Sequence, residues 1–217
     1  MPDRPERDPD LALHAALEEG LAALGMPLAA ARRQALIDYV HLLAKWNAVY
    51  NLTAVRDRRA MVTRHLLDSL AIAPYLHGRR LLDAGTGAGL PGMALALADP
   101  ARDWVLLDSS AKKTRFLTQV LIKLAPPNVE LVRARLEDYH PPQGFDSVVV
   151  RALGPWQGLI QRLRPLARDG GRLLIMHGAF SAADRRALRA SAPLLAELYR
   201  LAVPGLDGER HLIEIAV

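Results

Sequence analysis

Apolar residues recur at helical spacing through the first part of the chain. Leu13, Leu17, Leu21 and Leu24 are three or four residues apart, and Gly25 to Pro27 follow as a terminator, so the pattern predicts an amphipathic helix. Two further helices are predicted on the same grounds, one from Ala29 with Leu36, Val40 and Leu43 on one face and one over Arg58–Tyr75. Residues 1–78 are therefore predicted to form a helical extension.

The hydrophobic period changes from Arg79 onward, where short Leu-rich and β-branched runs alternate with helix-length segments. This alternation is typical of a parallel sheet covered by helices on both faces. Only residues 204–210 separate the last two runs, which is too short for a crossover helix and predicts an antiparallel final strand. The prediction for residues 79–217 is an α/β domain, compact with the extension, with strands at 80–83, 103–108, 129–133, 145–150, 172–176, 197–203 and 211–217.

Composition excludes several classes of protein. The 217 residues are 51% hydrophobic and 24% charged, as in an ordinary globular domain, and no cysteine is present. Disulfide frameworks, thiolate-ligated metals and thiolate nucleophiles are thereby excluded, and no metal is expected. No apolar run approaches the length of a membrane span and the N-terminus lacks an apolar signal segment, so the prediction is a cytoplasmic protein without membrane contact.

The net charge is +5, and 24 of the 28 basic residues are arginine. The planar guanidinium suits phosphate and base-edge recognition, which is compatible with a nucleic-acid partner. An Arg- and Ala-rich composition can equally reflect genome base composition, so charge alone does not decide between the two interpretations.

Four glycines stand where the first predicted strand meets its helix, in the segment Asp83–Gly92. Gly87, Gly89 and Gly92 match the G-x-G-x-x-G pattern that lets a backbone approach a ligand at the edge of a parallel sheet. The alternative is a tight strand-to-helix turn capped by Asp83. A turn needs one or two glycines rather than four, which favours a ligand-binding loop.

Two carboxylates narrow the choice of ligand. Asp83 precedes Gly85 by two residues, where a negative charge disfavours a pyrophosphate but attracts an ammonium group. Asp108 follows Gly85 by 23 residues, at the end of the second strand, where an acid accepts hydrogen bonds from a ribose. A nucleoside with a cationic amino-acid tail satisfies both, which predicts S-adenosylmethionine as cofactor and S-adenosylhomocysteine as product.

Further short motifs lie outside the glycine loop: Trp46, Asn47 and Asn51 to Val55; Arg64 to Ser69; Leu107 to Ser109 with Lys112 and Lys113; Arg151 and Ala152; and Asp207 to His211. With Asp83–Gly92, this combination strongly resembles the bacterial 16S rRNA (guanine-N7) methyltransferases, the glucose-inhibited division protein B family. The resemblance implies a class I S-adenosylmethionine-dependent methyltransferase fold and one guanine of the small-subunit rRNA as target. Cofactor-binding residues, from the loop argument and the resemblance together, are Asp83, Gly85, Gly87, Gly89, Leu90, Asp108, Leu136, Glu137 and Arg151.

The chemistry of guanine N7 agrees with what the sequence lacks. N7 offers a lone pair and no proton, so its methylation needs no general base, whereas cytosine-C5 transfer needs a cysteine nucleophile. Arg151, at the end of the fourth strand, is the predicted catalytic residue, because arginine is the usual partner of a guanine edge; the alternative is a salt bridge to Asp83 or Glu137. Trp156 is interpreted equally as a base-stacking residue or as core.

The expected partner is 16S rRNA or the 30S subunit, bound by a monomer. Basic residues near the loop end of the sheet would contact phosphates without reading sequence. One departure from the family is His177, where a lysine usually stands.

Alternative functions are methyl transfer to another RNA, to a protein or to a small molecule, or RNA binding by a module that has no transfer activity. The predicted RNA-binding residues are Arg58, Arg59, Arg64, Lys112, Lys113, Arg135 and Arg210.

Overall fold

A seven-stranded sheet forms the centre of the molecule in the computed structural model, which describes residues 9–191 and 196–217. The first eight residues of the predicted extension thus lie outside the described part. Six strands differ from their predicted ends by no more than two residues. The strands are β1 (Arg80–Ala84), β2 (Asp103–Leu107), β3 (Val129–Val132), β4 (Phe145–Arg151), β5 (Ala167–His177), β6 (Ala196–Leu201) and β7 (Arg210–Ala216).

The strand order is β3-β2-β1-β4-β5-β7-β6, with β7 antiparallel to both of its neighbours and the other pairs parallel. The predicted antiparallel final strand is confirmed. The fifth strand was predicted too short, because it begins at Ala167 instead of residue 172. Its register shifts between the pairs Phe145–Ala167 and Ser147–Arg172, so the residues between them, of which Arg168, Asp169 and Gly170 are exposed, bulge within the strand.

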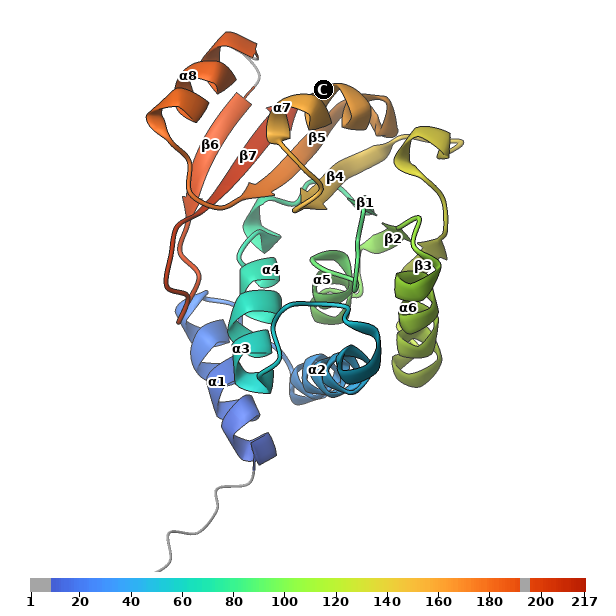
Figure 1. Cartoon of the computed structure of the whole chain (residues 1–217), viewed down its shortest axis with the longest axis vertical. Helices are drawn as coiled ribbons and strands as arrows, with labels where there is room; N and C mark the ends of the chain where they lie inside the picture. The colour runs from blue at the N-terminus through green and yellow to red at the C-terminus, as the bar shows by residue number, and fades with distance from the viewer. Residues whose placement is uncertain (1–8, 192–195) are drawn as a thin grey trace, which may run out of the picture.

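Alternating side chains of each strand build two separate apolar layers. Leu81 and Leu106 face the layer that also holds Leu17 and Leu43 of the helical extension, whereas the adjacent Leu82 faces the other layer. Helices cover both faces, as predicted for a largely parallel sheet (Figure 1). They are α1 (Pro9–Ala23), α2 (Ala30–Tyr50), α3 (Arg58–Met61), α4 (Asp68–Leu70), α5 (Gly92–Ala98) and α6 (Ala111–Leu124) on one side and α7 (Trp156–Leu163) and α8 (Ala182–Ser191) on the other.

The third predicted helix is interrupted by a wider turn. Between α3 and α4 the residues Val62–Leu67 form a π-helical turn, and a 3₁₀ turn, Ala73–Tyr75, ends the segment. The prediction of one regular helix over Arg58–Tyr75 is therefore wrong in its interior. Hydrophobic spacing alone does not distinguish an α turn from a π turn, which often occurs at functional sites.

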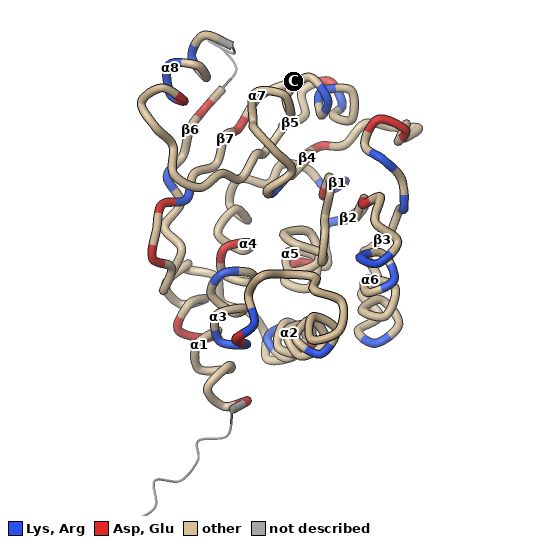
Figure 2. The backbone as a smooth tube through the Cα atoms, in the orientation of Figure 1, with Lys and Arg blue, Asp and Glu red and all other residues tan. Residues whose placement is uncertain are grey.

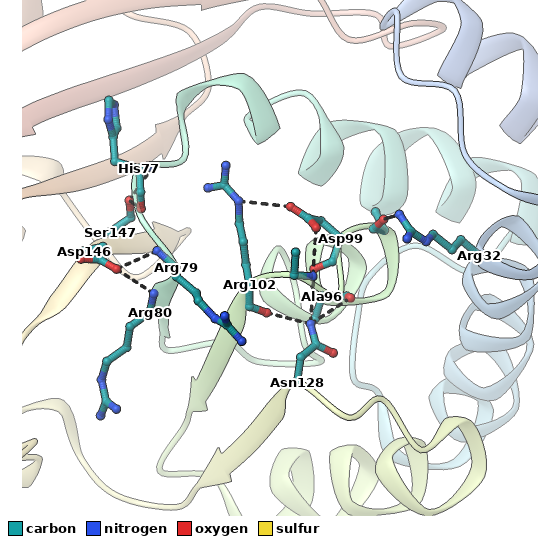
Figure 3. Close-up of polar contacts among 12 residues, drawn as sticks. Arg32, His77, Arg79, Arg80, Ala96, Asp99, Arg102, Asn128, Asp146 and Ser147 are labelled. Atoms are coloured by element: carbon teal, nitrogen blue, oxygen red, sulfur yellow. Dashed lines mark hydrogen bonds and ion pairs between the residues drawn. The ribbon is translucent and has the colours of Figure 1, made fainter.

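Polar contacts, most of them partly buried, join the helical extension to the sheet at the amino ends of the strands (Figure 3). The hydroxyl of Ser147 accepts the backbone N–H of His77 at 2.9 Å and donates to its carbonyl at 2.8 Å. Asp146 accepts the backbone N–H groups of Arg79 and Arg80, each at 2.7 Å. These contacts fix the point at which the chain leaves the extension and enters β1.

Replacing Ser147 with alanine is expected to lower the free energy of unfolding by about 1–2 kcal/mol, because two backbone groups of His77 lose their partner. Urea denaturation measures the effect. Asp103→Asn is the matched control: its ion pair with Arg79 is exposed on both sides and contributes about 0.5 kcal/mol or less. Equal losses in the two variants would show that the Ser147 contacts do not stabilise the joint.

Candidate active site

Asp83 lies fully buried near the end of β1, beneath the glycine loop. Its Oδ2 accepts the hydroxyl of Thr86 at 2.6 Å and the backbone N–H of Gly92 at 2.7 Å, so it does cap α5. Its Oδ1 is buried and has no hydrogen-bond partner among the described residues. Burial raises the pKa of Asp83 to about 6, although the bonds from Thr86 and Gly92 act in the opposite direction. One oxygen holds the loop and the other is left for a further donor.

Asp108 holds the same loop from the end of β2. Its Oδ2 accepts the backbone N–H of Gly87 at 2.8 Å, and its Oδ1 accepts that of Ser110 at 2.8 Å. Gly87 has φ of +63°, a conformation that costs glycine little and strains other residues. The Nζ of Lys113 lies 3.6 Å from Asp108 Oδ2 and balances its charge.

One cavity lies beside this loop and has a volume of about 380 Å³. We call it the loop cavity. Carboxylate, guanidinium and apolar groups line it together, which suits a ligand with both polar and apolar parts. Its lining residues are Gly85, Leu107, Asp108, Ser109, Ser110, Lys113, Ala134, Arg135, Leu136, Glu137, Ala152, Leu153 and Arg162.

The second cavity, which we call the arginine cavity, has a volume of about 690 Å³. The sheet supplies one part of its wall and the helical extension supplies the other. Ala152, which follows β4, lines both cavities, so the two adjoin at this residue. The arginine cavity is lined by Ala54, Val55, Arg64, His65, Asp68, Val150, Arg151, Ala152, Gly154, Leu159, Ile175, Met176, His177, Gly178 and Arg210.

A three-residue ion cluster lies in the wall of the arginine cavity. Arg151 Nη1 donates to Asp68 Oδ2 at 3.0 Å, and Arg210 Nε donates to Asp68 Oδ1 at 2.8 Å. Arg151 Nη1 also lies 3.4 Å from the carbonyl oxygen of Arg64. The Asp68 side chain is only 3% exposed. The salt bridge considered for Arg151 therefore exists, but its partner is Asp68 and neither Asp83 nor Glu137.

His65 faces the same cavity from the π-helical turn. Its Nε2 and the hydroxyl of Thr53 are 2.9 Å apart, and its Nδ1 lies 3.0 Å from the carbonyl oxygen of Arg64. Asn47 orders this region by accepting the N–H of Thr53 and donating to the carbonyl of Val55. Burial, followed by the charge of Arg151, lowers the pKa of His65 to about 4. The ring is therefore neutral at pH 7.

The predicted cofactor residues divide into three groups by their place relative to the two cavities. Gly85, Asp108, Leu136 and Glu137 line the loop cavity, and Arg151 lines the arginine cavity. The remaining four, Asp83, Gly87, Gly89 and Leu90, line neither of these cavities.

Leu90 is buried in the apolar core, and the Gly89 backbone packs so closely that a Cβ there would lie 2.7 Å from Leu117 Cδ2. The geometry gives these two residues a part in the shape of the loop. Tyr39 of α2 supports the same turn by donating its hydroxyl to the carbonyl of Ala88 at 2.7 Å.

The predicted RNA-binding residues lie in different surroundings. Arg58, Arg59 and Lys112 are exposed. They belong to α3 and α6, both of which carry basic residues, blue in Figure 2. Lys113 and Arg135 line the loop cavity, whereas Arg64 and Arg210 line the arginine cavity.

The structure also places Trp156 and His177. Trp156 is 1% exposed and packs near Phe180, so the core interpretation is correct and base stacking is excluded. His177, which stands where the family usually has lysine, lines the arginine cavity.

The family model described as rRNA small subunit methyltransferase G, GidB, matches residues 32–213. The chain belongs to the GidB family. Ribosomal RNA small subunit methyltransferase G of Nitrosococcus oceani is 43% identical over 199 residues, which cover 92% of each chain. The protein of the same name from Methylococcus capsulatus is 45% identical over 199 residues, or 92% of this chain and 96% of its own.

Solved structures confirm the fold class. The fibrillarin of Aeropyrum pernix, determined with bound S-adenosyl-L-methionine, superposes with a TM-score of 0.52 at 19% identity, over 66% of this chain and 68% of its own. The resemblance to the GidB family and the class I methyltransferase fold, both predicted from the sequence, are thus confirmed. Among the described residues, no helix has the length and apolarity needed to cross a membrane.

Two contacts of this GidB-family site were not predicted. The first is the pairing of Asp68 with Arg151 and Arg210. An acidic residue between the apolar runs Leu66–Leu67 and Leu70–Ile72 is a sequence signal for such a contact, since a buried charge needs a partner. The bond between Thr53 and His65 had no comparable signal, because it depends on the π-helical turn.

The pH dependence of stability follows from two opposed shifts. The unfolded chain binds a proton at His65 below pH 6.5, but the folded protein does so only near pH 4. Stability is therefore lost as the pH falls through this window, by about 3 kcal/mol in total. Asp83 acts in the opposite sense, because its folded pKa of about 6 exceeds its ordinary 3.8 and the folded state binds the extra proton.

His65→Gln removes the first contribution. The difference in unfolding free energy between wild type and variant is expected to shrink by about 3 kcal/mol between pH 7 and pH 4. Urea denaturation at a series of pH values measures the difference. A difference that stays constant with pH would contradict a depressed His65 pKa.

Proposed function

We propose that this protein transfers a methyl group from S-adenosylmethionine to N7 of a guanine in 16S rRNA, in the cytoplasm and as a monomer. One observation carries the proposal: a cavity beside a glycine loop adjoins a second cavity with an arginine-lined wall, and Ala152 lines both. Donor and acceptor could thus meet at this residue, as a direct displacement requires. The relatives described above bear the name of a small-subunit rRNA methyltransferase, which supports the same substrate class.

The residues present fit S-adenosylmethionine. The buried, unpartnered Oδ1 of Asp83 suits the ammonium group, and Asp108 suits the ribose hydroxyls. Leu136 and Glu137 would complete the site on the far wall of the loop cavity. When bound, the cofactor supplies a methyl group on a positively charged sulfur. Asp83, Gly85, Gly87, Gly89, Leu90, Asp108, Leu136, Glu137 and Arg151 are proposed together as the residues that bind or shape this site.

The acceptor side supports a reaction without proton abstraction. His65 stays neutral because its burial and the charge of Arg151 lower its pKa, and N7 has no proton for it to remove. Arg151 can donate a hydrogen bond to O6 of guanine, which distinguishes guanine from adenine. We propose Arg151 as the catalytic residue on this basis.

In this proposal the two parts of the chain, divided near residue 78, have different functions. Residues 79–217 would hold the donor, and the helical extension would supply much of the acceptor wall through Ala54, Val55 and His65. Exposed Arg58, Arg59 and Lys112 would contact phosphates of 16S rRNA or the 30S subunit around the site, with Arg64, Lys113, Arg135 and Arg210 closer to the cavities.

The decisive experiment incubates the protein with labelled S-adenosylmethionine and 30S subunits that lack the modification, then maps the label. Label on guanine N7 is expected, with a single-turnover rate that is flat between about pH 6 and 9, because no base titrates in the transfer step. Naked 16S rRNA, a bulk protein fraction and RNA-free buffer are the controls. Label found only on protein or on a small molecule would contradict the proposal and show a methyltransferase with another substrate. No label on any of these would favour an inactive RNA-binding module.

Asp108→Ala is expected to weaken S-adenosylmethionine binding by about ten- to a hundredfold, since a charge-assisted bond contributes about 1.5–3 kcal/mol. Calorimetry of the free protein measures the affinity. Asp103→Asn, at the opposite end of the same strand, is the control and should bind normally. Unchanged affinity in Asp108→Ala would exclude a ribose contact by this residue.

A further inference from the structure

A single buried carboxylate connects three separate segments of the arginine cavity. Asp68 opens α4, Arg151 ends β4 and Arg210 begins β7. Each carboxylate oxygen accepts a bond from a different arginine, at 3.0 and 2.8 Å. Among the described residues that line the cavity, Asp68 is the only acidic one.

These bonds restrict how Arg151 can lie. Its Nη1 is engaged by Asp68 and by the carbonyl oxygen of Arg64, so the guanidinium is held at one end. Nε and Nη2 have no hydrogen-bond partner in the described structure and stay available to a ligand. With a side chain only 19% exposed, Arg151 cannot turn away without leaving the charge of Asp68 partly unpaired.

The charge of the cavity depends on the same carboxylate. Arg151 and Arg210 repel each other if Asp68 is neutral, and both repel a purine that gains positive charge on methylation at N7. The Asp68 carboxylate lies between the two guanidinium groups and offsets part of this positive field. A preorganised field around the reacting group is a large contribution to catalysis in general.

We propose that Asp68 is a positioning residue of the methyl transfer, acting through Arg151. It fixes the guanidinium on the cavity wall so that the free nitrogens meet guanine where N7 faces the donor, and it keeps the cavity from becoming too positive for the product. This inference rests on the proposed function. It differs from a purely structural role. In that case the loss of Asp68 would impair folding, and its effect on the transfer rate would be the same whether or not Arg151 is present.

A double-mutant cycle separates the two roles. Asp68→Asn, Arg151→Ala and the double variant are compared with wild type in single turnovers with saturating 30S subunits and S-adenosylmethionine. Asp68→Asn is expected to slow transfer by about tenfold or more, with a smaller loss of cofactor affinity because Asp68 lines the arginine cavity and not the loop cavity. In the Arg151→Ala background the same change should cost less than about twofold, because the group it positions is gone.

Controls keep the outcomes distinct. Asp103→Asn removes an exposed Asp–Arg pair far from the cavity and should transfer at the wild-type rate. Asp68→Glu keeps the charge but moves the carboxylate by one methylene; a folded but slower variant supports positioning even if Asp68→Asn fails to fold. A wild-type rate in Asp68→Asn or Asp68→Glu, or fully additive losses in the cycle, overturns the inference. If wild-type protein itself transfers no methyl group to 30S subunits, the proposed function fails and the inference falls with it.

Discussion

The whole site depends on one constraint, that the carboxyl ends of parallel strands meet at a single edge of the sheet. β1, β2 and β4 are neighbours in the order β2-β1-β4, so Asp83, Asp108 and Arg151 come together although they are distant in sequence. Asp83 and Asp108 then fix the glycine loop from two sides by accepting its backbone N–H groups. Sheet geometry, rather than any local motif, decides where the ligand-binding groups lie.

The helical extension is attached to this sheet at both ends of the strands. At the amino ends, Ser147 and Asp146 hold the chain between His77 and Arg80 by backbone contacts. At the carboxyl ends, Asp68 of the extension meets Arg151. The apolar layer between them holds residues of both parts, so a shift of the extension would have to break polar contacts at either end and the packing in the middle. The arginine cavity is consequently a property of the whole chain.

The sequence was most informative where physical patterns are local. Hydrophobic spacing predicted the seven strands, and the short link before β7 predicted its direction, because these features depend on neighbouring residues. The positions of Asp83 and Asp108 followed from strand ends in the same way. Contacts between distant segments could not be predicted: nothing local indicates that Asp68 pairs with Arg151 and Arg210, or that the turn at Val62–Leu67 is π-helical and brings His65 to Thr53.

Ala152 adopts a left-handed backbone conformation, with φ of +56°, at the residue where the two cavities adjoin. This conformation strains an alanine by about 1 kcal/mol, a strain that glycine would avoid. The chain therefore keeps a side chain, at some energetic cost, at the residue that the two cavities share. An alanine leaves its backbone fewer conformations than a glycine would, so the segment that follows β4 is stiffened where one reactant would meet the other.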